Sequence, residues 1–160
     1  MKDVKITTTY QVFESKEELP KEIITLFKEA EKARDLAYAP YSNFQVGAAI
    51  LFENNTIVTG SNQENAAYPS GMCAERVAIY HAGSQYPDLK IKALVITAKS
   101  NTKTVDKPVG PCGACRQSIA EYEMKQEKDI AIYFMGEVGK VVKSNSLKDL
   151  LPLSFDKSFL

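Results

Sequence analysis

The three cysteines of this chain have the spacing of a metal site. Cys73 lies in the run MCAER, and Cys112 and Cys115 lie in the run PCGACRQ. Three protein ligands fill three positions of a tetrahedral zinc site and leave the fourth for water, as in catalytic zinc sites. Glu75, two residues after the first cysteine, is then free to move protons instead of binding metal. The sequence therefore predicts a catalytic zinc site with Glu75 as its general acid and base.

The elements that carry these residues must bring them together. Cys112 and Cys115 are three residues apart and follow a proline, so they would share one face of the first turn of a helix. Free N–H groups and the helix dipole favour thiolates there. Cys73 and Glu75 would point about 200° apart in the middle of a helix, because a helix has 3.6 residues per turn. They can serve one site only if a helix begins at Cys73.

Other interpretations of these residues are open. The Cys-x-x-Cys pair could be a redox pair, and Cys73 could be a buried core cysteine. A structural zinc would need a fourth ligand, and His81 is the only histidine, about two helical turns beyond Cys73. Three thiolates also give a zinc centre a net negative charge, which Arg76 or Arg116 could offset. The proline before the pair and the upstream Cys-Ala-Glu favour the catalytic zinc site.

The composition is that of an ordinary globular protein. The chain has 160 residues, 44% of them hydrophobic, with 20 basic and 20 acidic side chains. We expect one domain over residues 1–160, with residues 1–15 as an N-terminal arm or extra strand. The balanced charge argues against nucleic acid polymers and membranes as partners. No stretch reaches the ~20 apolar residues of a membrane span, and the start of the sequence lacks the apolar core of a signal peptide. The small number of cysteines, all in metal-ligand motifs, fits a reducing cytoplasm.

The hydrophobic pattern alternates between helix and strand periods. A helix with a capping box at Ser15 is expected to end before Pro40. Further helices are expected over residues 73–82, 112–123 and 146–151, and strands over 44–51, 57–60, 91–97, 130–135 and 141–144. Residues 4–13 fit either an edge strand or a loose arm. The expected fold is α/β, with three layers (α/β/α) and a central mixed sheet of about five strands.

Five blocks of sequence closely resemble the cytidine deaminases of the short form, which have three cysteine ligands. The resemblance runs from about residue 39 to residue 155. The blocks are APYSxFxVGAA from Ala39, NxENAxYP from Asn62, CAER from Cys73, PCGACRQ from Pro111 and LLPxSF from Leu150. The chain departs from the family in its first ~15 residues and in a longer, more charged segment at 121–129.

The resemblance implies zinc-dependent hydrolysis of cytidine and deoxycytidine to uridine and deoxyuridine with release of ammonia, in pyrimidine salvage. It implies one Zn²⁺ per chain, with Cys73, Cys112 and Cys115 as ligands and Glu75 as the proton shuttle. A related deaminase of a nucleoside analogue such as blasticidin S is the alternative activity. A zinc module without catalysis, its fourth metal position closed, is the alternative from another class.

The resemblance also implies roles for residues that bind the nucleoside. Phe44 would stack on the pyrimidine, Asn62 and Glu64 would bind the ribose 3′-hydroxyl, and the backbone of Ala74 would meet the base edge. Arg76 would hydrogen-bond the ligand sulfurs. The family's members of this length are homotetramers, so three residues would reach a neighbour's site: Ala66, Tyr68 and Phe155. Otherwise, Phe44 and Phe155 could be core residues of their own subunit, and Asn62 and Glu64 could be turn residues.

Overall fold

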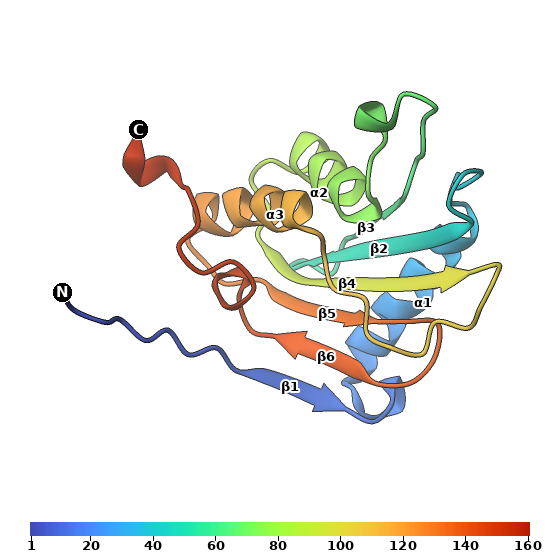
Figure 1. Cartoon of the computed structure of the whole chain (residues 1–160), viewed down its shortest axis with the longest axis horizontal. Coiled ribbons are helices and arrows are strands. Elements are labelled where there is room, and N and C mark those ends of the chain that lie inside the picture. The colour runs from blue at the N-terminus through green and yellow to red at the C-terminus, as the bar shows by residue number, and fades with distance from the viewer.

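A single mixed sheet forms the centre of the structure, a computed structural model that describes residues 1–160 (Figure 1). Its six strands lie in the order β1-β6-β5-β4-β2-β3, and only β4 and β5 run parallel to one another. The strands are β1 Tyr10–Phe13, β2 Phe44–Phe52, β3 Ile57–Ser61, β4 Ile91–Ser100, β5 Ala131–Met135 and β6 Val141–Ser144. The sheet has six strands instead of about five because β1 adds an edge strand.

Three helices cover the two faces of the sheet and complete the expected α/β/α layers. Helix α1 (Lys21–Asp35) packs on one face, and α2 (Ala74–Gln85) and α3 (Gly113–Lys125) lie side by side on the other (Figure 1). Each face has its own apolar core, and β4 contributes alternate residues to both. The chain also contains four short 3₁₀ turns, at Lys16–Glu18, Tyr68–Ser70, Leu147–Asp149 and Lys157–Phe159. No helix is long and apolar enough to cross a membrane.

Helix α1 begins later than the sequence pattern predicted. Ser15 makes no side-chain capping bond, and Pro20 occupies the N-cap position of α1 instead. The carbonyl oxygen of Pro20 accepts hydrogen bonds from the N–H groups of Ile23 and Ile24. Proline is unfavourable inside a helix but tolerated at its first residues, so it separates the turn after Ser15 from the helix proper. The predicted capping box is therefore wrong.

Two glycines let helices approach the sheet closely. A Cβ atom on Gly47 of β2 would lie 2.0 Å from the carbonyl oxygen of Ala30 in α1. A Cβ atom on Gly60 of β3 would lie 2.5 Å from the backbone nitrogen of Ala78 in α2. Real Cβ atoms do not come so near to backbone, so both positions need the absence of a side chain. The contact at Gly60 fixes α2, and with it the N-terminal turn that carries Cys73, against the sheet.

A buried carboxylate fixes α3 to the C-terminal part of the fold. Glu123 accepts hydrogen bonds from the backbone N–H groups of Ile130 and Leu147 and from the Ser146 hydroxyl, at 2.7–3.0 Å. Its side chain is almost fully buried, and buried carboxylates are stable only with such partners. Glu123 thus ties α3 to the start of β5 and to the 3₁₀ turn at Leu147–Asp149.

Candidate metal centre and its cavity

The three cysteines meet where α2 and α3 begin. Cys73 is the N-cap residue of α2, Cys112 is the N-cap residue of α3, and Cys115 lies in the first turn of α3. Their sulfur atoms lie within 4.8 Å of one another, with 3.8 Å between Cys73 and Cys112 and 3.5 Å between Cys112 and Cys115. A tetrahedral zinc with Zn–S bonds of about 2.3 Å requires sulfurs about 3.8 Å apart. The donor set therefore fits zinc with little movement.

The surroundings of Cys73 favour its negatively charged thiolate form. A hydrogen bond from the Cys115 thiol, helped by Cys112 and by the positive charge of Arg76, lowers the pKa of Cys73 to about 5. The same bond with Cys73, together with burial, raises the pKa of Cys115. The opposite directions of the two shifts mean that Cys73 gives up its proton more readily than Cys115 does. A metal ion would displace the remaining protons, because only deprotonated thiols are full ligands.

Glu75 lies beside this cluster in the first turn of α2. Its side chain is buried, with 5% of the residue exposed, and it lines the same cavity as Cys73 and Cys112. Burial raises the pKa of the Glu75 carboxyl, and the nearby Cys73 thiolate raises it further. A carboxyl that gives up its proton less readily than usual suits a group that must both take and return protons near neutral pH. The predicted helix start at Cys73, with Glu75 in the first turn, is confirmed.

The two arginines next to the cysteines differ in what they contact. The side chain of Arg116 donates to the carbonyl oxygens of Pro111 and Leu150, at 2.8 and 2.9 Å. Arg76 donates to the carbonyl oxygen of Gly71 at 3.3 Å, and its buried Nε has no hydrogen-bond partner. Arg76 also lies close enough to Cys73 to lower the pKa of that thiol. Of the two, Arg76 is the cation that can offset thiolate charge, whereas Arg116 fixes the backbone before α3.

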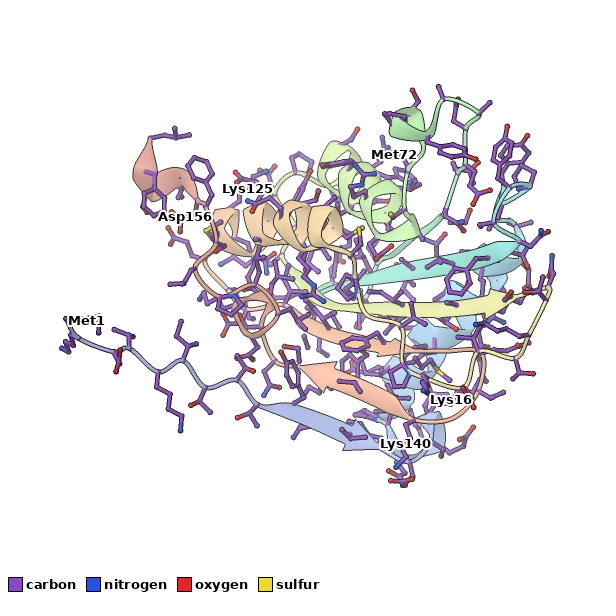
Figure 2. All side chains as sticks on the ribbon, in the orientation of Figure 1. Met1, Lys16, Met72, Lys125, Lys140 and Asp156 are labelled. Atoms are coloured by element: carbon purple, nitrogen blue, oxygen red, sulfur yellow. The ribbon has the colours of Figure 1, made fainter.

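A cavity of about 780 Å³ opens over the cluster. This volume lies within the usual range for small-molecule sites, about 300–1,000 Å³. Figure 2 labels Met72, which precedes Cys73 and lies in the cavity wall. The wall joins the start of β2, the segment after β3, the start of α2 and the residues before α3. It includes eight side chains named from the sequence: Phe44, Asn62, Glu64, Tyr68, Cys73, Glu75, Arg76 and Cys112.

Asn62 and Glu64 hold the segment that carries Phe44. The Asn62 amide donates to the carbonyl oxygen of Phe44 at 2.9 Å and accepts from the N–H of Val46 at 2.7 Å. The Glu64 carboxylate accepts from the N–H of Tyr41 at 2.8 Å and also from the hydroxyl of Ser42. The bond from Ser42 is the main reason that the pKa of Glu64 is lowered. Both side chains therefore position the cavity wall as well as facing the cavity.

Some cavity residues received no role from the sequence alone. Tyr41 and Ser42 lie in the wall, and so do Val109 and Gly110. The Ser42 hydroxyl also accepts from the N–H of Phe44 at 3.0 Å, so it links Phe44 to Glu64. Ser42 stands in the first motif block and Gly110 directly precedes Pro111. The position of these residues in or beside a motif was therefore the only sequence signal for a role in the cavity. The spacing of residues in the sequence did not indicate their contacts.

Four residues named from the sequence do not line this cavity through their own side chains: the expected zinc ligand Cys115 and three residues expected near the nucleoside. Ala74 and Cys115 are both fully buried, whereas Cys73 and Cys112 line the cavity. Ala66 is exposed in the segment between β3 and α2. Phe155 is 59% exposed in the C-terminal tail, where its ring stacks on Phe159 and its carbonyl oxygen accepts from Gln117. Phe155 therefore does not cap the core of its own subunit.

Comparisons with known proteins agree with this site. The family described as "Cytidine and deoxycytidylate deaminase zinc-binding region" matches residues 20–128, which include the whole cysteine cluster. A cytidine deaminase of Halalkalibacterium halodurans is 39% identical over 130 residues, 81% of this chain and 91% of the relative. A cytidine deaminase of Sporosarcina psychrophila is 42% identical over 135 residues, 84% of this chain and 92% of the relative.

The fold is also similar to solved structures. The crystal structure of cytidine deaminase from Burkholderia pseudomallei superposes with a TM-score of 0.70 at 34% sequence identity. The similarity covers 82% of this chain and 97% of that one. Nearly all of the solved structure thus has a counterpart here, while this chain has additional residues.

Proposed function

Since this chain belongs to the family of cytidine and deoxycytidylate deaminases with a zinc-binding region, we propose that it hydrolyses cytidine and deoxycytidine to uridine and deoxyuridine. Ammonia is the second product, because water replaces the exocyclic amine. The observation that carries the proposal is one cavity that joins the cysteine cluster and Glu75 to an aromatic and polar wall. The only cluster of metal-binding side chains holds three residues, which leaves a position for water and argues against a closed structural site.

Cys73, Cys112 and Cys115 would hold the zinc. When bound, zinc supplies a Lewis acid that lowers the pKa of water toward about 7. Glu75 takes a proton from the attacking water and delivers it to ring nitrogen N3 as C4 is attacked. Glu75 then passes a second proton to the amine, which leaves as ammonia. One buried carboxyl with a raised pKa can act first as base and then as acid.

The other wall residues are proposed to bind the nucleoside. Phe44 would stack on the pyrimidine, and its place in the cavity wall supports that role. Asn62 and Glu64 would bind the ribose 3′-hydroxyl, using donor and acceptor capacity beyond their bonds to the 41–46 segment. The backbone of Ala74, between Cys73 and Glu75, would meet the base edge. Arg76, with its unpaired Nε, would hydrogen-bond the ligand sulfurs.

Replacing Ser42 by alanine is expected to raise the KM for cytidine about three- to tenfold, since one hydrogen bond worth ~1 kcal/mol is lost. The reason is that the Ser42 hydroxyl links Glu64 to the backbone of Phe44. Ser42→Thr, which keeps the hydroxyl, is the matched control. Steady-state kinetics and zinc content of both variants check the effect. An unchanged KM in Ser42→Ala would show that the link does not position the wall.

A spectrophotometric assay on cytidine tests the proposed activity. The purified protein is expected to lower the absorbance of cytidine and to release one ammonia per nucleoside converted. Deoxycytidine, cytidine in an oligonucleotide and blasticidin S serve as comparison substrates. Turnover of blasticidin S without turnover of cytidine would favour the analogue deaminase, and no turnover of any substrate by the zinc-loaded protein would refute the proposal.

We further propose a homotetramer whose sites are completed by residues of a neighbouring subunit: Ala66, Tyr68 and Phe155. Tyr68 also lines the cavity of its own chain, so it would lie between two sites. The exposure of Phe155 (59%) and Tyr68 (76%) in a single chain supports the tetramer, because large aromatic side chains are costly to leave in water. The balanced charge and the thiol ligands support a cytoplasmic nucleoside enzyme of pyrimidine salvage that does not bind nucleic acid polymers.

Phe155→Ala is expected to raise the KM for cytidine and to weaken the tetramer, since an aromatic ring that excludes water from the base would be lost. The activity per chain of the wild type is expected to fall on dilution below its association constant. Sedimentation and activity across one dilution series check both results. Lys157→Ala, which changes an exposed polar side chain of the same tail, is the control. A fully active monomer that is indifferent to Phe155→Ala would refute the shared site.

A further inference from the structure

The N-terminal arm, defined here as residues 1–9, has almost no packing partner within its own chain. All its residues except the half-buried Thr8 are exposed, and its backbone makes no turn or loop hydrogen bond. Figure 1 shows the arm running away from the body from the start of β1, and Figure 2 labels Met1 at its far end. The arm lies outside the region that matches the family, which starts at residue 20. The match to the family therefore does not account for the arm.

The sequence of the arm has the pattern of a strand with one buried face. The even-numbered positions from residue 4 into β1 are apolar at Val4, Ile6, Tyr10 and Val12 but polar at Thr8, and the odd-numbered positions up to residue 11 are polar. The exposed fractions of the four apolar residues are 78%, 50%, 40% and 57%. Alternate residues of an extended segment lie on the same face, so these side chains form one apolar stripe. Such alternation is typical of a half-buried strand, and the single chain covers the stripe only in part: Tyr10 is 40% exposed, and its hydroxyl donates to the carbonyl oxygen of Asp149 at 2.7 Å.

The exposed area of the chain leads to the same conclusion. The total accessible surface is 9093 Å². A compact monomer of 17.7 kDa is expected to expose only about 7,900 Å². The excess of roughly 1,100 Å² is larger than the ~800 Å² that each partner contributes to a standard protein interface. The excess includes the extended arm and tail, and it is large enough to form one half of an interface.

Three further features favour a second copy of this chain as the partner. Strand β1 pairs with β6 on one side only, so it is an edge strand and can accept another extended segment. The net charge is zero, so copies of the chain do not repel one another. The C-terminal tail projects on the same side of the molecule as the arm (Figure 1), with Leu153 and Phe159 exposed. Two projecting apolar segments on one side match a contact that two copies make reciprocally.

We propose that the N-terminal arm packs against a second copy of this chain, with Val4 and Ile6 facing inward. This inference goes beyond the proposed function, since no residue of the arm lines the catalytic cavity. It also differs from the shared site of Phe155, because it concerns a segment outside the matched family region. The arm is an assembly element and is not required for the chemistry at Glu75.

Trypsin cleavage after Lys5 reports directly on whether the arm is covered. The full-length protein is digested at high and low concentration, release of the arm peptide is followed by mass spectrometry, and association is measured by sedimentation. The double variant Val4→Ser and Ile6→Ser removes the apolar stripe. The matched control, Thr7→Ser and Thr9→Ser, changes the same number of residues on the polar face. The wild type is expected to be cleaved at least about tenfold more slowly when associated than when diluted.

The double variant Val4→Ser and Ile6→Ser is expected to lose this protection and to associate at least about tenfold more weakly, while the control behaves like the wild type. Protection that persists in samples that sedimentation shows to be dissociated would place the arm on its own chain and overturn the proposal. Protection that needs added cell extract would assign the arm to another partner and overturn it equally. Cytidine turnover is measured in the same samples, so a failure of the arm proposal is distinguished from a failure of the proposed activity.

Discussion

Replacing Glu75 by glutamine is expected to abolish nearly all turnover of cytidine and to leave the zinc content unchanged. A general acid or base typically contributes 10²- to 10⁴-fold to the rate, and Glu75 would act in two proton transfers, so the upper end of that range or beyond is expected. Glutamine has nearly the same shape but cannot take or return a proton. No other carboxyl group lies in the first turn of α2 to take over its function. Steady-state kinetics and metal analysis of the purified variant check this.

Glu64→Gln is an informative comparison, because Glu64 is a second carboxylate in the same cavity wall. Replacing Glu64 by glutamine is expected to raise the KM for cytidine and to reduce kcat far less than Glu75→Gln does. The reason is that Glu64 binds the backbone of Tyr41 and the hydroxyl of Ser42 and is not adjacent to a cysteine in sequence. The role of Glu75 as proton carrier would be wrong if Glu75→Gln kept more than about a tenth of the wild-type kcat, against the loss expected from general acid–base catalysis.

Replacing Cys112 by serine is expected to remove the zinc, to lower kcat below about a hundredth of the wild-type value and to reduce thermal stability by several degrees. Serine is a favourable N-cap residue, so the start of α3 should stay intact and the effect should report the loss of a ligand. The stability falls because metal that binds only the folded chain shifts the folding equilibrium. Metal analysis, activity and thermal unfolding of the same preparation measure the three effects.

Treatment of the wild type with a chelator is expected to reproduce the loss of activity and the lowered melting temperature. His81→Ala is the control, since His81 is exposed on α2 and lies outside the cysteine cluster. It is expected to keep its zinc and its activity. Full zinc occupancy in Cys112→Ser would contradict the ligand assignment.

The zinc cluster was predictable because its determinants are local. The two-residue spacing of Cys73 and Glu75 requires a helix start, and the structure places Cys73 at the N-cap of α2. The three-residue spacing of Cys112 and Cys115 likewise requires the first turn of α3. Each half of the site therefore follows from a few consecutive residues. The meeting of the two halves followed from the resemblance to the family and not from spacing.

The parts that could not be predicted depend on contacts between distant segments. The sequence of Asn62 and Glu64 does not reveal that both hold the backbone of residues 41–46, which only the pairing of β2 with β3 brings near. The start of α1 was wrong because the spacing after Ser15 was given more weight than the break at Pro20. Residues 4–13 fitted both an edge strand and an arm. In the structure the residues before Tyr10 belong to the arm, and Tyr10–Phe13 form the edge strand β1.

The pairing of β1 with β6 has a consequence for how the chain folds. Tyr10 pairs with Ser144, so the first strand of the sheet in chain order joins the last one. Contacts between such distant residues form slowly, because a long loop must close before they contribute. The core strands β2 and β4 can pair much earlier, since their partners are nearer in sequence. We therefore expect the edge that presents the arm to close last, so that assembly through the arm begins only once the sheet is complete.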